Sequence, residues 1–179
     1  MNIKTKNEDL DRLSTEEFIA SGKAPIYVVL DNIRSAQNVG SVFRTMDAFR
    51  CAKLYICGIS AIPPHREINK TALGSTQSVE WKYFENTLDA IENLKTQGVD
   101  IFAVEQTQNS IMLNDFKVDH NRKTAFIFGN EVSGVDQIIV DNADGSIEIP
   151  QYGSKHSLNI SVCAGIVIWH AIHGFKYEW

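Results

Sequence analysis

The sequence contains few cysteines, and their spacing is not that of a metal or disulfide site. The chain of 179 residues has three, Cys51, Cys57 and Cys163, and no two of them form a C-x-x-C pair. An odd number of isolated cysteines indicates neither a disulfide framework nor a zinc site. We therefore expect buried, reduced thiols in a cytoplasmic protein that holds no metal ion.

Long apolar runs and an excess of positive charge are also absent. Residues 158–172 are almost wholly apolar, but this segment is too short to cross a bilayer and contains Asn159, Ser161 and His170. Residues 1–12 are polar and charged, unlike a signal peptide. The sequence therefore predicts no membrane association. The net charge of −5 weakens the case for a nucleic-acid partner without excluding it, because the local distribution of charge decides such binding.

Two common nucleotide-binding motifs are missing from the sequence. It contains neither G-x-x-x-x-G-K-[ST], which forms phosphate-binding loops, nor the dinucleotide-binding pattern G-x-G-x-x-G. The composition is otherwise ordinary for a soluble globular protein, with 44% hydrophobic and 22% charged residues, and the length fits one domain.

Apolar runs of strand length alternate with helix-like patterns along the chain. Because such continuous apolar runs are typical of buried parallel strands, they predict an α/β protein with a mostly parallel sheet and helices on both faces. The candidate strands are residues 26–30, 54–57, 78–84, 100–104, 124–128 and 146–149. The candidate helices are residues 14–20, 38–49 and 87–97, with a last helix that begins near Ser157. Residues 1–24 form a short charged extension before a domain of residues 25–179.

Three segments place small and polar residues where strands pass into helices. They are residues 38–45, residues 128–134, and residues 149–153 together with 157–162. Open α/β sheets bind ligands at such turns, because the carboxyl ends of parallel strands meet at one edge. Three polar turns of this kind therefore predict one assembled binding site.

The first segment predicts a helix that carries an arginine near a ligand. Gly40 and Arg44 share one face at i and i+4, with Ser41 beside them. We expect the Arg44 side chain to lie over these small residues, point toward the sheet edge and meet an anion in a cleft there. Taken alone, the pattern is more typical of a surface arginine. The helix start at Asn38 and the small residues favour a functional role.

The second and third segments supply a close backbone approach and polar side chains. Gly129 follows an apolar strand and lets a ligand come near the backbone, while Glu131 places a carboxylate at the same edge. Ser157 is expected as the N-cap of the last helix, and Asn159 then needs a polar partner within its first turn. This helix is apolar all round, which predicts burial on every side, and a homodimer interface is one way to bury it.

Together these segments resemble the three motifs of the SpoU (TrmH) branch of the SPOUT RNA methyltransferases. The resemblance is carried by Asn38-x-Gly40-x3-Arg44-Thr45, by Gly129-Asn130-Glu131-x2-Gly134, and by Ile149-Pro150 followed by Ser157-Leu158-Asn159-x-Ser161-Val162. The stretch from Lys70 to Ser75 is similar to the family's segment between its first two motifs. The resemblance covers residues 25–175, in the family's order and spacing.

This resemblance implies an α/β knot, a mostly parallel sheet protein whose C-terminal segment threads a loop to form a deep trefoil knot. It also implies S-adenosylmethionine as cofactor, a homodimer, and methyl transfer to a ribose 2′-hydroxyl of tRNA or rRNA without a metal. By motif position, the catalytic residues are Arg44, Asn38, Glu131, Ser157 and Asn159. The cofactor-binding residues are Val104, Glu105, Gly129, Ile149, Ser157 and Leu158.

Several alternatives stay open at this point. Gln151 stands where many relatives have methionine, and base methylation is compatible with the same fold. Arg44 acts either as a base, aided by a substrate phosphate, or as an electrostatic stabiliser; the second role is easier to defend because a guanidinium stays protonated. One rival is a non-catalytic RNA-binding module, which the presence of all five polar site residues opposes. Another is a dehydrogenase, which the missing glycine pattern opposes.

Overall fold

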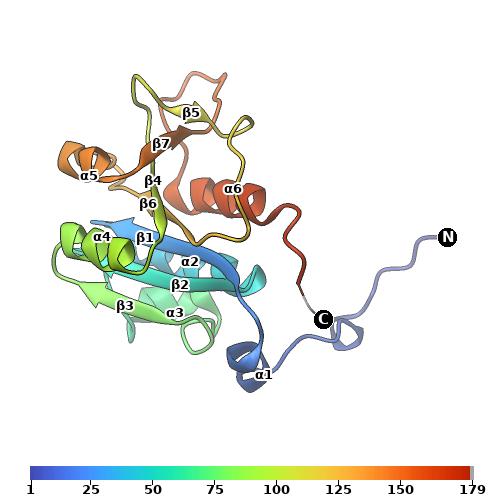
Figure 1. Ribbon diagram of the computed structural model, residues 1–179. Helices are drawn as coiled ribbons and strands as arrows, with labels where there is room; N and C mark the ends of the chain where they lie inside the picture. The colour runs from blue at the N-terminus through green and yellow to red at the C-terminus, as the bar shows by residue number, and fades with distance from the viewer. Residues whose placement is uncertain (178–179) are drawn as a thin grey trace.

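The computed structural model describes residues 1–177, in which helices cover both faces of a central sheet (Figure 1). The helices are η1 (Asn7–Asp9, a 3-10 helix), α1 (Thr15–Ala20), α2 (Ala36–Ala48), α3 (Arg66–Ala72), α4 (Thr87–Thr96), α5 (Gln137–Asn142) and α6 (Ile160–Ile172). The strands are β1 (Ala24–Asp31), β2 (Cys51–Cys57), β3 (Trp81–Phe84), β4 (Asp100–Val104), β5 (Ile111–Met112), β6 (Thr124–Phe128) and β7 (Gly145–Glu148). Within residues 1–177, none of these helices combines the length and the apolar composition that a membrane crossing requires.

The sheet has seven strands in the order β3-β2-β1-β6-β4-β7-β5, and all of its strand pairings are parallel. β1 lies between β2 and β6, so Val28 is paired with Leu54 on one side and with Phe126 on the other. The apolar runs in these central strands are continuous because both faces of the sheet are covered. The predicted parallel α/β sheet is therefore confirmed.

Two helical layers enclose this sheet. On one face, α2, α3 and α6 pack over the strands, and Val28 lies there in a cluster with Phe43. On the opposite face, α4 and α5 pack over the strands, and Val29 lies in a second cluster with Leu94 and Ile139. Val28 and Val29 belong to different clusters because the side chains of successive residues in a strand point to opposite faces of the sheet. Helices on both faces were expected and are confirmed.

Besides the single-turn helix η1, three short elements, α3, α5 and β5, lie outside the set predicted from the sequence. They have seven, six and two residues respectively, which is too short for an apolar period to stand out. The predicted strand at residues 78–84 begins only at Trp81, because the Ser78 hydroxyl donates to the Asp47 carboxylate while the chain is still turning.

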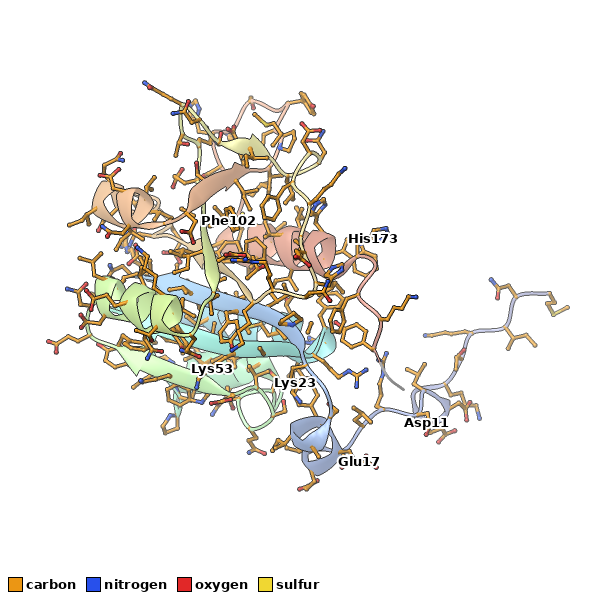
Figure 2. All side chains as sticks on the ribbon, viewed as in Figure 1. Asp11, Glu17, Lys23, Lys53, Phe102 and His173 are labelled. Atoms are coloured by element: carbon orange, nitrogen blue, oxygen red, sulfur yellow. The ribbon has the colours of Figure 1, made fainter. Side chains whose placement is uncertain are left out.

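The chain before α1 extends away from the sheet and its helical layers (Figure 1), whereas α1 packs Phe18 into the core cluster on the α2 face. Figure 2 shows the labelled Asp11 and Glu17 outside the sheet and its helical layers. α1 begins after Ser14, whose hydroxyl accepts a hydrogen bond from the Glu17 N–H at 3.2 Å. The Ser14 N–H in turn donates to the Glu17 carboxylate at 2.7 Å. Ser14 is therefore the N-cap of α1 in a reciprocal capping box, at the start of the helix expected over residues 14–20.

Asp31, the last residue of β1, has a buried carboxyl group. Its exposed fraction is 1%, and one of its carboxyl oxygens accepts hydrogen bonds from the Thr87 hydroxyl at 2.5 Å and the Asn32 amide at 3.0 Å. Burial raises the pKa of Asp31 above its ordinary value, and the neighbouring Asp136 carboxylate adds to the increase, which the hydrogen bonds only partly offset.

The variant Asp31→Asn should gain stability relative to the wild type as the pH rises. A raised pKa means that folding favours the protonated aspartate. The wild type therefore loses stability as the pH climbs from about 4, the ordinary aspartate pKa, through the raised value. Asparagine does not ionise, so the variant escapes this loss. Urea titrations between about pH 4 and pH 8 measure the effect, and a stability difference that is constant with pH would contradict it.

Candidate functional site

A cavity lies at the carboxyl ends of β4, β6 and β7. The last residues of these strands, Val104, Phe128 and Glu148, are among its walls, and the first residues of α6 close it. Its volume is about 330 Å³, within the range of small-molecule sites. This is the edge of the sheet at which the sequence predicts a ligand.

All six residues that were expected to bind the cofactor line this cavity. The last residue of β4 and the residue after it supply two of them, the turn after β6 supplies one, and the connection from β7 to α6 supplies the rest. In chain order they are Val104, Glu105, Gly129, Ile149, Ser157 and Leu158. The structure thus brings the six together at one site, and their binding role stays a prediction.

Gly129 begins the turn after β6 and lies against the backbone of Gly134 and Val135, where the same turn ends. A Cβ at this position would lie 2.2 Å from the Gly134 carbonyl carbon and 2.3 Å from the Val135 nitrogen. Gly134 has a φ of +71°, and the Val135 N–H donates to the Glu105 carboxylate at 2.9 Å. The glycines therefore let this turn fold tightly against the loop that follows β4.

The Glu131 carboxylate joins this turn to the beginning of α2. One oxygen accepts the Arg34 N–H at 2.9 Å, and the other accepts the Ser35 N–H at 3.1 Å and the Asn38 amide at 3.0 Å. Burial by itself would raise the pKa of Glu131. These donors outweigh it and hold the pKa below its ordinary value, so the group is ionised at neutral pH.

The third segment is connected to the same network through Asn159. Its amide donates to the Asn38 side-chain oxygen at 3.3 Å, and its own side-chain oxygen accepts the Ser161 N–H at 2.9 Å. Asn159 is therefore the N-cap of α6, and the expectation that Ser157 would cap this helix was wrong. Hydrogen bonds thus link all three sequence motifs: Glu131 to Asn38, and Asn38 to Asn159.

Arg44 does not lie at this cavity, contrary to the expectation that it would point to the sheet edge. It is exposed and lines a separate hollow of about 530 Å³ between α2 and α3, with Ser41, Lys70 and Thr71 among its neighbours. Six residues separate it from Asn38, a rotation of about 600° around the helix, so the two side chains leave in different directions. Gly40 faces α3 instead, where a Cβ would lie 2.4 Å from a backbone oxygen.

The cavity at the carboxyl edge of the sheet has a negative lining. Glu105, Glu131 and Glu148 contribute to its wall, and the described residues around it include no lysine or arginine. Such a site favours a positively charged ligand and disfavours the pyrophosphate of a dinucleotide. Within residues 1–177, no three His, Cys, Asp or Glu side chains are grouped so that they could hold a metal ion.

Residues 25–169 match the model of the SpoU rRNA Methylase family. This protein belongs to the SpoU rRNA methylase family. Among its relatives is the tRNA (guanosine(18)-2'-O)-methyltransferase of Aquifex aeolicus, 33% identical over 159 residues that cover 87% of this chain and 72% of the relative. The enzyme of the same name from Escherichia coli K12 is 30% identical over 159 residues, which cover 87% of this chain and 66% of the relative.

Solved structures of SpoU proteins share the fold. The A. aeolicus TrmH/SpoU tRNA modifying enzyme gives a TM-score of 0.76 at 28% identity, covering 87% of this chain and 78% of that chain. The AdoMet-bound rRNA methyltransferase from Sinorhizobium meliloti gives a TM-score of 0.79 at 25% identity, covering 92% of this chain and 62% of that chain. The family expected from the three motifs is therefore confirmed.

Two further residues of this SpoU cavity, Gln106 and Cys163, are not singled out by sequence reasoning. The Gln106 amide donates to the His156 carbonyl oxygen at 2.8 Å and ties the loop after β4 to the connection from β7 to α6. Burial raises the pKa of the Cys163 thiol to about 12, so the thiol stays protonated at neutral pH. The position of Gln106, just beyond a predicted strand, could have indicated it, whereas a cysteine within an apolar helix gives no such signal.

Proposed function

We propose that this protein transfers a methyl group from S-adenosylmethionine to a ribose 2′-hydroxyl of tRNA or rRNA. The observation that carries the proposal is the acidic cavity at the carboxyl edge of the sheet, around which the residues of all three SpoU motifs are hydrogen-bonded together. The relatives named as tRNA 2′-O-methyltransferases support the same reaction. We place this activity in the cytoplasm, in a domain of residues 25–179 that follows a short extension.

The cavity fits S-adenosylmethionine in both shape and charge. Val104, Ile149 and Leu158 offer apolar surface for an adenine ring, and the carboxylates of Glu105 and Glu131 offer a negative environment for a sulfonium. When bound, the cofactor supplies a methyl group that is already activated for displacement by an oxygen nucleophile. The transfer needs no metal, and we propose none.

The residues around the cavity would hold the reacting ribose and steady the charge that develops on its oxygen. Glu131 and Asn159 fix the Asn38 amide, and Asn159 lines the cavity, so these two amides are preorganised to orient a hydroxyl. Ser157 also lines the cavity and offers its hydroxyl to the same group. Arg44 lies outside this cavity in its own chain, so we propose that its guanidinium acts at the cavity of a second copy, where it would stabilise the developing alkoxide. Within residues 1–177 its side chain makes no hydrogen bond or ion pair, which leaves the guanidinium available to an RNA substrate.

A homodimer would explain an apolar surface that one chain leaves uncovered. α6 was expected to be buried on every side, yet Val162, Ile166 and Trp169 are 51%, 38% and 60% exposed. These residues repeat at i, i+4 and i+7 and form one stripe along the helix. The Trp169 ring packs at 5.7 Å from that of Phe49, which also lines the hollow of Arg44. A second copy seated on this stripe would bring residues of both chains near each site.

The variant Trp169→Glu should convert the dimer to a monomer, because a charge in the centre of an apolar interface is left unpaired. Sedimentation velocity measures the change in mass. Ile138→Glu is the matched control, since Ile138 is an equally exposed apolar residue, 56%, on the distant helix α5. A Trp169→Glu protein with the mass of the wild type would argue against this interface.

Two measurements test the proposed reaction. Titration calorimetry should detect S-adenosylmethionine binding and no binding of NAD; the reverse result would favour a dehydrogenase. Mass spectrometry of RNA nucleosides from cells with and without the gene should show the loss of one 2′-O-methylated nucleoside. Cofactor binding without any missing nucleoside, and without methyl transfer in vitro, would favour an RNA-binding module instead.

A further inference from the structure

Tyr152 is an aromatic side chain that the fold leaves in solvent. It is 97% exposed. Within residues 1–177 its ring makes no aromatic contact and its hydroxyl makes no hydrogen bond. The stability of this chain therefore does not account for an aromatic residue at this position, since a ring in solvent buries no apolar surface.

The place of Tyr152 in the chain puts it beside the cavity. It lies in the connection from β7 to α6, and both ends of that connection line the cavity, through Ile149 and Gln151 before it and Ser157 and Leu158 after it. Residues 151–159 are all exposed and form no regular structure. Figure 1 shows this connection looping out at the end of the sheet next to β5 before it enters α6.

The charge of the same connection is unlike that of the protein as a whole. Residues 149–159 contain Lys155 and no aspartate or glutamate, in a chain whose net charge is −5. His156, next to Lys155, is held by the hydrogen bond from Gln106. An exposed aromatic ring with a cation nearby and no carboxylate is the combination that binds single-stranded nucleic acid, since the ring stacks on a base and the cation meets the phosphate.

We propose that Tyr152 stacks on a nucleobase of the RNA substrate adjacent to the ribose in the cavity, and that Lys155 contacts a phosphate of the same strand. This inference rests on the proposed function, because it takes the ribose as the group that enters the cavity. A ribose can enter only if its nucleotide leaves the helical stack, and the base so released exposes a face for Tyr152. Tyr152 is then a positioning residue that acts on RNA and not on the cofactor.

Three substitutions at Tyr152 separate stacking from simple packing. Tyr152→Ala should weaken binding of a fluorescein-labelled single-stranded oligoribonucleotide of mixed sequence by about 5-fold to 100-fold, as measured by anisotropy. Tyr152→Phe keeps the ring and should stay within about twofold of the wild type. Tyr152→Leu keeps apolar bulk without an aromatic face and should resemble alanine.

Steady-state kinetics should show that Tyr152 affects the binding of RNA and not the binding of the cofactor. With RNA from cells that lack the gene as substrate, Tyr152→Ala should raise KM for RNA while kcat and the affinity for S-adenosylmethionine stay near their wild-type values. Lys155→Ala should lower the slope of log affinity against log salt by about 0.7, as expected for one phosphate of a single strand. Tyr152→Ala should leave that slope unchanged.

Tyr83→Ala is the control for the loss of a surface tyrosine elsewhere, because Tyr83 is 40% exposed and lies on the edge strand β3, where its hydroxyl donates to the Gly58 carbonyl oxygen at 3.0 Å. Equal RNA affinity and KM in the wild type and Tyr152→Ala would overturn the stacking role, as would an equal loss in Tyr83→Ala. A Tyr152→Leu protein that binds as tightly as Tyr152→Phe would also overturn it. Failure of the proposed function looks different, since the wild type would then bind no S-adenosylmethionine and transfer no methyl group.

Discussion

Replacement of Arg44 by alanine should slow methyl transfer by about 10²- to 10³-fold, the effect of removing one charged donor from a developing oxyanion. The melting temperature should not change, because Arg44 is exposed and its side chain makes no hydrogen bond or ion pair within residues 1–177. The affinity for S-adenosylmethionine should not change either, because Arg44 does not line the cavity at the carboxyl edge of the sheet. Single-turnover assays with saturating RNA and cofactor measure the rate.

Two further variants separate this role from general electrostatic attraction of RNA. Arg44→Lys keeps the charge but loses the planar fork of donors, so it should recover only part of the rate. Arg66→Ala removes another exposed arginine, at the start of α3, and should leave kcat unchanged. Turnover near the wild-type rate in Arg44→Ala would remove Arg44 from the chemistry.

Replacement of Gly129 by alanine should abolish cofactor binding and lower stability. The added Cβ would lie 2.2 Å from the Gly134 carbonyl carbon and 2.3 Å from both the Gly134 oxygen and the Val135 nitrogen. All three are backbone atoms, so the clash cannot be relieved by a side-chain rotation, and the turn that forms the cavity wall has to move. We expect a cost of about 1–3 kcal/mol in unfolding free energy, together with a displaced binding surface.

Thermal unfolding with and without S-adenosylmethionine measures both effects. The wild type should be stabilised by the cofactor, and Gly129→Ala should melt at a lower temperature and show no such gain. Gly153→Ala is the control, because no atom lies within 4 Å of a Cβ at that position, which belongs to the third segment. Cofactor stabilisation of Gly129→Ala equal to that of the wild type would show that this close approach does not shape the site.

Much of the architecture follows from the sequence for a simple physical reason. Strands buried on both faces are apolar at nearly every position, so runs such as residues 26–30 and 124–128 can be recognised in the sequence. Once the sheet is parallel, the carboxyl ends of its strands meet at one edge. The three polar segments could therefore be predicted to meet. The cavity contains residues of the second and third segments. Asn38 of the first segment is hydrogen-bonded to Glu131 of the second and to Asn159 of the third.

The short elements and the burial of α6 are harder to predict from the sequence. α3 and α5 have too few residues to show a period, and they are held by contacts with the sheet and with other helices. α6 is apolar on every side, and that pattern does not reveal which side one chain covers. Only the packed structure shows that the stripe of Val162, Ile166 and Trp169 is left uncovered.

The sequence by itself determined the parallel α/β sheet, the short helix that begins at Ser14 and the family to which the chain belongs. These depend on the spacing of residues along the chain, which the sequence contains in full. The tertiary structure decided which polar groups act together. Glu131 reaches Asn38 across 93 residues and Asn159 reaches Asn38 across 121, while Arg44, only six residues from Asn38, turns to another face of the same helix. The number of residues between two positions of a helix determines the angle between their side chains. The distance between residues of different helices and turns depends instead on how the chain folds.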